Sequence, residues 1–145
     1  MGVILAGLGV SGVGLWARRD VRRGLERERI VAPGGAPVKN ASAARALAET
    51  IREQTLEATG GRTYAETEPY LAADGSATSD RAGAMLDPAT GRPAGNPDVD
   101  LWIQSTTLQT ALMQAYMAFR LSDLMLGLGG ALVLAGSGIA AATRR

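Results

Sequence analysis

The sequence predicts an all-α membrane protein. Two transmembrane helices flank a small, helical and turn-rich ectodomain, and the long C-terminal helix continues into the membrane. Two apolar runs without a charged side chain, Met1–Ala17 and Leu124–Ala142, support this fold, and most charged residues lie between them. Composition supports it as well, because only 4% of the residues are aromatic and Gly and Ala are abundant, which argues against a large soluble core.

The domain organisation follows from these runs. An ectodomain of roughly 80 residues is marginal for a core of its own, so we expect support from the membrane helices or from a partner. The predicted segments are a transmembrane helix at 1–17, a basic juxtamembrane helix with a Pro/Gly loop at 18–39, the ectodomain at 40–119, a second transmembrane helix at 120–142 and a basic tail at 143–145.

Two missing residue types exclude much chemistry. The chain has no Cys and no His, so it lacks thiolate nucleophiles, the commonest general base and the commonest transition-metal ligands. We therefore expect no metal and no cofactor. The formal net charge of +1 gives no electrostatic attraction to nucleic acid, and we expect no nucleic-acid partner.

The two apolar runs differ in length. Crossing roughly 30 Å of hydrocarbon takes about 20 residues, which Leu124–Ala142 nearly supplies before Thr143 and two arginines suited to lipid headgroups. The first run, Met1–Ala17, is marginal. It lacks the basic start and the cleavage site of a signal peptide, and Trp16 suits the membrane interface, so we expect a retained helix.

Small residues recur at helical spacing in both runs. Such residues let helix backbones approach closely in lipid, which predicts a two-helix hairpin, a homo-oligomer or contact with another membrane protein. The alternative is that Gly and Ala are simply common in transmembrane helices. The predicted packing residues are Gly7 and Ser11 in the first run and Gly127, Ala131 and Ala135 in the second.

The flanking charges give conflicting predictions of topology. Six arginines and three acidic residues follow the first run, which by the positive-inside rule places the middle region in the cytoplasm. The arginines after the second run place the C-terminus there instead. We expect a multi-pass protein of the cell membrane with an extracytoplasmic middle region, partly because of the resemblance described below.

The stretch TGGRTYAE, residues 59–66, follows a predicted helix that begins near Asn40 or Ser42. Gly60 and Gly61 come directly after the last helical residue, where a left-handed cap is favoured, whereas a phosphate-binding loop has its glycines before a helix. We therefore predict a helix stop. The loop behind it docks back on the structure with Tyr64 as its anchor, and Arg62, Tyr64 and Glu66 form a candidate ligand-binding or docking site.

From Pro69 to Pro97 the chain is rich in turn-forming residues. Asp74 and Asp80 lie in a stretch that faintly resembles a calcium loop, but the ordered acidic spacing is missing and a plain turn is the favoured interpretation. The sequence SDRAGAML, residues 79–86, suggests a short helix between the turns.

A long helix is predicted to begin near Asp98 and to run into the membrane, since no Gly or Pro interrupts it before Gly127. Arg120 and Asp123 are three residues apart and are expected to form an interface ion pair; a proton or ion pathway is the alternative. The apolar side of this helix is expected to pack on the stripe Ala44, Leu47 and Ile51 of the preceding helix. That side comprises Leu101, Leu108, Leu112, Ala115 and Phe119.

The stretches LEATGGRTYAE and LWIQSTTLQTALMQAYMAFRLSDLMLGLGGALVLAG resemble a family of small two-span actinobacterial membrane proteins of unassigned function. The resemblance runs from about Leu56 onward, and more loosely over the first helix, and it implies an external middle region. Members often carry the label aromatic ring-opening dioxygenase. Extradiol chemistry uses iron held by two His and a carboxylate, so a chain without His would be a non-catalytic member.

Three functional hypotheses remain open from the sequence. The favoured one is a non-enzymatic accessory or scaffold subunit of a membrane assembly, with the lipid bilayer and either another membrane protein or further copies of itself as partners. The second is an envelope module that binds a lipid or small ligand through the TGGRTYAE loop. The third is an enzyme that uses carboxylates such as Glu66 and Glu68.

Overall fold

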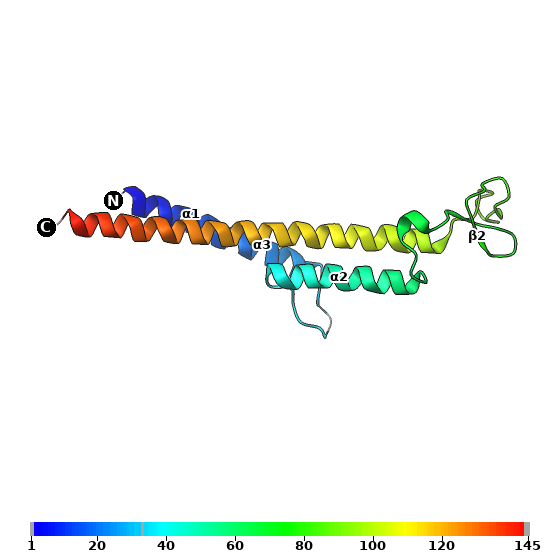
Figure 1. Cartoon of the computed structure of the whole chain (residues 1–145), viewed down its shortest axis with the longest axis horizontal. Coiled ribbons are helices and arrows are strands. Elements are labelled where there is room, and N and C mark those ends of the chain that lie inside the picture. Colours follow the sequence, from blue (N-terminus) through cyan, green and yellow to red (C-terminus); the bar gives the residue numbers. More distant parts are fainter. Residues whose placement is uncertain (1, 33, 144–145) are drawn as a thin grey trace. The chain divides into compact units, whose positions relative to one another are not determined.

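The structure, a computed structural model, describes residues 2–32 and 34–143 and is mostly helical in this part of the chain (Figure 1). The chain divides into two compact units. One contains the residues up to Leu47 together with those from Ala111 onward, and the other is Ala48–Thr110. The elements in chain order are α1 (Gly2–Arg27), α2 (Ala41–Ala58), a 3-10 turn (Tyr64–Glu66), β1 (Tyr70–Leu71), β2 (Ala77–Thr78) and α3 (Pro97–Ala142).

Helix α3 confirms the prediction of one continuous helix that starts near Asp98. Asn96 caps it, because its Oδ1 accepts a hydrogen bond of 3.0 Å from the Asp98 N–H, and Pro97 occupies the first helical position. Among the described residues, α3 is the one helix long and apolar enough to cross a membrane. Only 11% of its most apolar window is buried, whereas the core helix of a soluble protein is mostly buried.

Helix α1 continues past its apolar run, so the arginine-rich segment extends the helix as far as Arg27, as predicted. It ends when the Ile30 N–H bonds to the Leu25 carbonyl at 3.0 Å. The Pro/Gly loop then follows, with an isolated bridge between Val31 and Pro37.

Helix α2 is capped by Asn40 rather than by Ser42. The Asn40 Oδ1 accepts hydrogen bonds of 2.8 Å from both the Ala43 N–H and the Ser42 hydroxyl. Ala44 and Leu47 are buried as predicted. Further along, Thr55 and Thr59 are buried. Each threonine hydroxyl donates a hydrogen bond to the backbone carbonyl four residues earlier, so neither hydroxyl is left without a partner.

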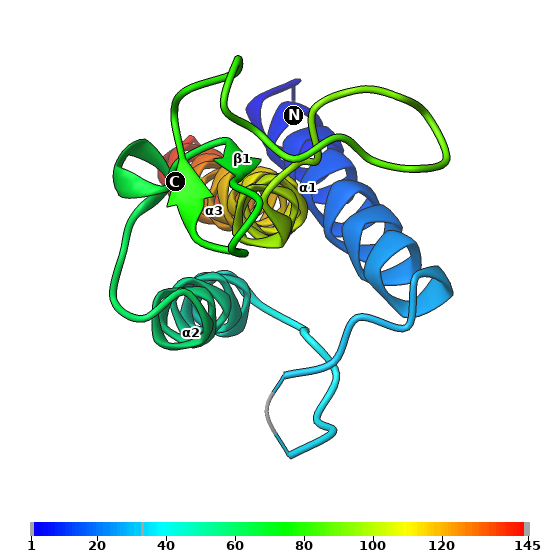
Figure 2. The ribbon, with the colours of Figure 1, turned by 90° about the vertical axis from the view of Figure 1, so that its right-hand side faces the viewer.

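The turn-rich segment corrects two predictions. It contains an antiparallel pair, β1 with β2, in which Tyr70 faces Thr78, so the protein is not purely helical (Figure 2). The short helix predicted at 79–86 is wrong. Its residues instead form isolated β-bridges with other segments of the chain, Ala84 with Ala72 and Leu86 with Pro93.

Asp74 lies in a plain turn of this segment. Its Oδ1 accepts hydrogen bonds from the Ser76 hydroxyl at 2.6 Å and from the Ser76 N–H at 2.9 Å, and these bonds, the hydroxyl one foremost, lower the pKa of Asp74. Within residues 2–32 and 34–143, no three acidic side chains gather as a metal site would require.

The buried face of α3 differs in part from the predicted stripe. Leu112, Ala115 and Phe119 are buried as expected, but Leu101 and Leu108 remain 37% and 38% exposed. Trp102 and Ser105 take the buried positions instead, because the inward face follows a spacing closer to seven residues per two turns.

Candidate functional site

The TGGRTYAE stretch begins with the predicted helix stop. The Gly61 N–H bonds to the Leu56 carbonyl at 2.7 Å and the Gly60 N–H to the Glu57 carbonyl at 3.2 Å, which is the pairing of a Schellman cap. Both glycines have positive φ, +64° and +80°, where an L side chain is strained. The two glycines therefore end α2.

Arg62 fixes the loop after this cap. Its guanidinium forms a salt bridge of 3.2 Å with Asp98 at the start of α3, and its carbonyl accepts the indole N–H of Trp102 at 3.2 Å. Trp102 is only 5% exposed, whereas Tyr64 is 54% exposed. The expectation that Tyr64 anchors the loop is therefore wrong. Trp102 anchors it, because the larger indole buries more apolar surface while its N–H still finds an acceptor.

Glu66 is engaged within its own turn. Its Oε2 accepts hydrogen bonds from the Thr63 N–H at 2.9 Å and from the Thr63 hydroxyl at 2.8 Å. These two bonds, the backbone one foremost, lower the pKa of Glu66 from its ordinary value because they favour the charged form. Arg62 and Glu66 thus have structural partners, and Tyr64 is the exposed functional group of the predicted triplet.

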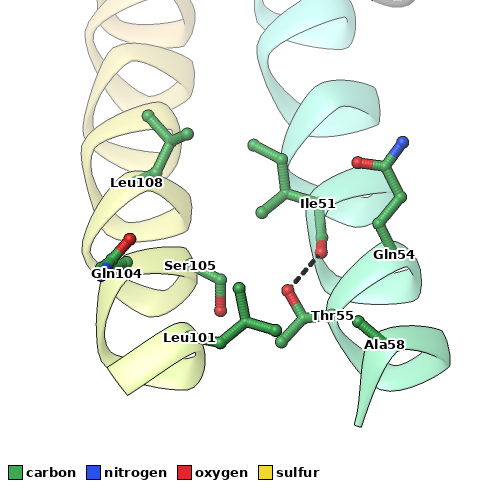
Figure 3. Close-up of a pocket in the computed structure, with 8 residues that line it drawn as sticks. All are labelled: Ile51, Gln54, Thr55, Ala58, Leu101, Gln104, Ser105 and Leu108. Atoms are coloured by element: carbon green, nitrogen blue, oxygen red, sulfur yellow. Dashed lines mark hydrogen bonds between the residues drawn. The ribbon is translucent and has the colours of Figure 1, made fainter. Parts of the chain in front are cut away.

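A cleft of about 380 Å³ opens between α2 and α3 within the Ala48–Thr110 unit. Figure 3 shows Ile51 and Thr55 of α2 facing Leu101 and Ser105 of α3. The predicted stripe residues Ile51, Leu101 and Leu108 therefore line an open cleft at this level. The full lining is Ile51, Gln54, Thr55, Ala58, Leu101, Gln104, Ser105 and Leu108.

The cleft is mainly apolar in character. The Thr55 hydroxyl donates to the Ile51 carbonyl at 2.8 Å and the Ser105 hydroxyl to the Trp102 carbonyl at 3.0 Å, so both hydroxyls are satisfied by their own helices. Gln54 and Gln104 contribute amide groups, and neither residue was among the predicted site residues. Each lies three residues after a predicted stripe residue, Gln54 after Ile51 and Gln104 after Leu101. This helical spacing is the sequence signal that could have identified them.

The second site is the contact between α1 and α3, which we call the seam. A Cβ atom added to Gly7 would lie 2.7 Å from the Gly129 carbonyl oxygen, and one added to Gly136 would lie 2.7 Å from a side-chain carbon of Ile4. The residue numbers of contacting pairs, such as Ile4 with Gly136 and Ser11 with Gly129, fall on α1 as they rise on α3, so the helices are antiparallel. The backbones approach so closely that most side chains would not fit.

The seam repeats every seven residues on both helices. Gly7 and Gly14 contribute from α1, and Ser122, Gly129 and Gly136 contribute from α3. A repeat of seven residues keeps two helices in contact when they supercoil gently around one another. The predicted packing residues Gly7 and Ser11 thus contact α3.

Gly127, Ala131 and Ala135 do not take part in the seam. All three are exposed, and no described atom lies within 4 Å of a Cβ built on Gly127. The expectation that they pack within the hairpin is wrong, because the face of α3 toward α1 is instead set by the spacing of Ser122, Gly129 and Gly136. Contact with another molecule through Gly127, Ala131 and Ala135 remains a prediction.

An ion pair closes one end of the seam. Asp123 bonds to Arg18 of α1 at 2.7 Å, and the Arg120 guanidinium lies over the Tyr116 ring at 5.9 Å from its centroid. The predicted pair between Arg120 and Asp123 is therefore wrong. The glycine contacts bring α1 close enough for Arg18 to reach Asp123, which the spacing along a single helix does not reveal.

The outward surface of the α1–α3 pair is apolar. Leu5 and Leu8 of α1 are 63% and 56% exposed, and Leu124 and Leu134 of α3 are 67% and 75% exposed. The smallest residues thus lie inside this pair and the large aliphatic residues lie outside, which is the reverse of a soluble helix pair.

Comparison with known proteins adds no family or relative. No protein-family model, no curated protein and no solved structure matches the chain.

Proposed function

We propose that the chain is a non-enzymatic accessory or scaffold subunit of a membrane assembly, anchored by a hairpin of α1 and α3. The observation that carries the proposal is the distribution of side chains in the α1–α3 pair, which has glycine in the seam and large aliphatic side chains on the outside. In water, exposed leucine side chains would each forfeit roughly 2 kcal/mol of burial. In lipid they are already solvated, and close backbone packing holds the pair together.

The charge boundary supports two spans rather than one. Arg18 is the first charge after the apolar run of α1, and Asp123 is the last before the apolar run of α3. Their ion pair brings the two boundaries to the same level. Trp16, 69% exposed, lies just inside this level and suits the interface between lipid and water. Both apolar runs thus enter the membrane together under this proposal.

Membrane association is tested by washing membranes that contain the full chain with alkaline carbonate. An integral hairpin stays in the pellet and leaves it only with detergent. Recovery of the protein in the wash would contradict the proposal, whatever its other properties.

The extracytoplasmic position of the middle region is tested by cysteine labelling, since the chain has no native thiol. In chain order, Ser79 lies in the middle region between α1 and α3, and Thr143 directly follows α3. A membrane-impermeant maleimide applied to intact cells should label Ser79→Cys and spare Thr143→Cys. The reverse pattern would place the middle region in the cytoplasm and leave the hairpin proposal standing.

The accessory role is tested by purification in a mild detergent. A subunit of an assembly should be recovered with a stoichiometric partner or as a homo-oligomer. A monodisperse monomer that is functional without any partner would argue against the accessory role.

A second candidate function is an envelope module that binds an apolar ligand. The cleft favours it, because its volume of about 380 Å³ lies within the range of small-molecule sites and its lining combines leucine and isoleucine with two amides. The TGGRTYAE loop is less suited, since Arg62 and Glu66 are engaged. Leu108→Trp should fill the cleft and displace a co-purifying lipid detected by mass spectrometry, whereas the exposed neighbour change Thr107→Trp should not. Equal lipid content in the two variants would exclude the cleft as the site.

A further inference from the structure

The arginines that follow the apolar run of α1 divide into two groups. Arg18 forms the ion pair that closes the seam, and the Arg22 Nε donates a hydrogen bond to the Lys39 carbonyl at 3.0 Å. Arg19 and Arg23 are exposed, and their guanidinium groups have no hydrogen-bond or salt-bridge partner among the described residues. The fold therefore uses the first two arginines and leaves the charges of the second two available.

Arg19 and Arg23 share their side of α1 with Trp16. Trp16 is 69% exposed and lies at the end of the apolar run, and the two arginines follow it by three and seven residues. At about 100° per residue, the three side chains lie within roughly 60° of one another around the helix. An indole followed by arginines one and two turns later is the arrangement expected where a helix leaves lipid for water.

Distance along the helix decides which arginines reach the lipid headgroups. The polar headgroup layer is roughly 5–7 Å thick on each side of the hydrocarbon. At 1.5 Å per residue, Arg19 lies about 3 Å beyond Ala17, the last residue of the apolar run, and Arg23 lies about 9 Å beyond it. Arg19 is thus within the layer, and the long side chain of Arg23 reaches back into it. Arg27, about 15 Å beyond Ala17, lies outside the layer.

The charge at this level favours an anionic partner. Residues 18–24 of α1 and 117–123 of α3, the two turns next to the apolar runs, carry five arginines and two aspartates, a net charge of +3. Because Asp123 pairs with Arg18, Asp20 is the one acidic side chain in these two segments that is left to offset the other arginines. A positive charge so close to a bilayer attracts lipids with a net negative headgroup.

We infer that Trp16, Arg19 and Arg23 form a binding site for the headgroup of an anionic phospholipid. The inference rests on the proposed membrane insertion, since it needs the apolar run of α1 to lie in the bilayer. The two guanidinium groups donate charge-assisted hydrogen bonds to the phosphate oxygens, and the Trp16 ring lies against the upper part of the acyl chains. A zwitterionic lipid offers the same phosphate, but its ammonium group lies close to the arginines, so it binds more weakly.

Trp16 itself reports which lipids lie beside α1. The full chain is reconstituted in vesicles of phosphatidylcholine and phosphatidylglycerol, in which one of the two lipids carries bromine on its acyl chains and quenches indole fluorescence on contact. Subtracting the signal of a Trp16→Phe chain removes the contribution of Trp102. At equal mole fractions, brominated phosphatidylglycerol should occupy the site several-fold more often than brominated phosphatidylcholine.

Three variants locate the preference. Arg19→Gln combined with Arg23→Gln should remove most of it, because each basic residue near an anionic surface contributes a factor of about five in affinity. Asp20→Asn should increase it, because the substitution removes the acidic group at the same level. Arg27→Gln is the matched control, with the same loss of charge on the same helix outside the headgroup layer, and it should leave the preference unchanged.

Equal quenching by the two brominated lipids would overturn the inference while leaving the membrane proposal in place. A preference that survives the double substitution would also overturn it, as would an equal loss in Arg27→Gln, which would assign the preference to the overall charge of α1. Absence of quenching by either lipid would place Trp16 outside the bilayer and would overturn the membrane proposal as well.

Discussion

The seam and the loop after α2 both contain glycines and an ion pair between arginine and aspartate, but the glycines are needed for different reasons. In the seam, Gly7 and Gly129 have ordinary helical backbone but no space for a side chain, since a Cβ on Gly7 would lie 2.7 Å from the Gly129 carbonyl oxygen. In the loop, Gly60 and Gly61 have open space, with no described atom within 4 Å of an added Cβ, but positive φ.

This difference separates two physical reasons for the same residue type. In the seam there is no room for a larger side chain, so the loss of stability on substituting a glycine should grow with the size of the new side chain. In the loop the backbone has positive φ, which strains any residue with a Cβ. The loss of stability should therefore be nearly the same for alanine and for larger residues. Substitutions of matched glycines in the seam and in the loop test this distinction.

The largest effect is expected for Gly129→Leu. A Cβ at this position would overlap Ser11 Oγ and lie 2.6 Å from the Gly7 carbonyl oxygen, so α1 must move away. Overpacking costs about 3 kcal/mol, and more where backbone atoms obstruct relaxation. The melting temperature in mild detergent, followed by circular dichroism, should fall markedly.

Gly127→Leu is the matched control, two residues away on the same helix. No described atom lies within 4 Å of its added Cβ, so the melting temperature should hold or rise slightly through improved helix propensity. Similar losses in both variants would show that the seam is not the cause.

Gly61→Ala should destabilise the cap by about 1 kcal/mol, because alanine at φ +80° is strained. Faster hydrogen exchange of the amides in the last turn of α2 would measure it. Gly9→Ala in α1 should instead be neutral or stabilising, since Gly9 is helical and no described atom crowds it. If Gly61→Leu costs several times more than Gly61→Ala, size rather than backbone geometry governs the loop.

Neutralising the ion pairs should have smaller effects. Arg18 and Asp123 are 29% and 46% exposed at 2.7 Å, while Arg62 and Asp98 are 48% and 30% exposed at 3.2 Å. Solvent screening limits each to about 1 kcal/mol or less. Asp123→Asn should lower the melting temperature more than Asp98→Asn, because its shorter pair borders the apolar run.

A charge reversal provides the control for the seam pair. Arg18→Asp combined with Asp123→Arg should recover part of the loss caused by either change alone. No recovery would mean that Arg18 and Asp123 act independently of each other.

The smallest effect concerns pH. Because the hydrogen bonds from Thr63 lower the pKa of Glu66 in the folded state, the carboxylate stabilises the loop above its ordinary pKa of 4.5, and this stabilisation fades as the pH falls below that value. Trp102 fluorescence in a Trp16→Phe background should report the change. The Glu66→Gln variant should lack this part of the pH profile; an identical profile would exclude Glu66 as its source.

Local rules predicted the ends of the helices well. The cap at Asn40, the stop at Gly60 and Gly61 and the start of α3 each depend on residues within one turn, so the sequence determines them directly. The β1–β2 pair was missed because each strand has only two residues, which is too short for an alternating apolar and polar pattern to show in the sequence.

Tertiary choices among similar residues were predicted less well. The spacing along α3 predicted Arg120 as the partner of Asp123, and only the approach of α1 selects Arg18 instead. Likewise, α3 offers several glycines, and a spacing of four residues favoured Gly127 over Gly129. The seven-residue interval between Gly129 and Gly136, matched by Gly7 and Gly14 in α1, is the sequence signal that identifies the seam.

A contact built from backbone rather than from side chains has a consequence for sequence variation. Random mutagenesis should tolerate exchange among leucine, valine and isoleucine on the outer surface of α1, yet reject nearly every codon change at Gly7 or Gly129. Over evolutionary time, the invariant positions of this hairpin should therefore be its smallest residues, and the bulky ones should drift.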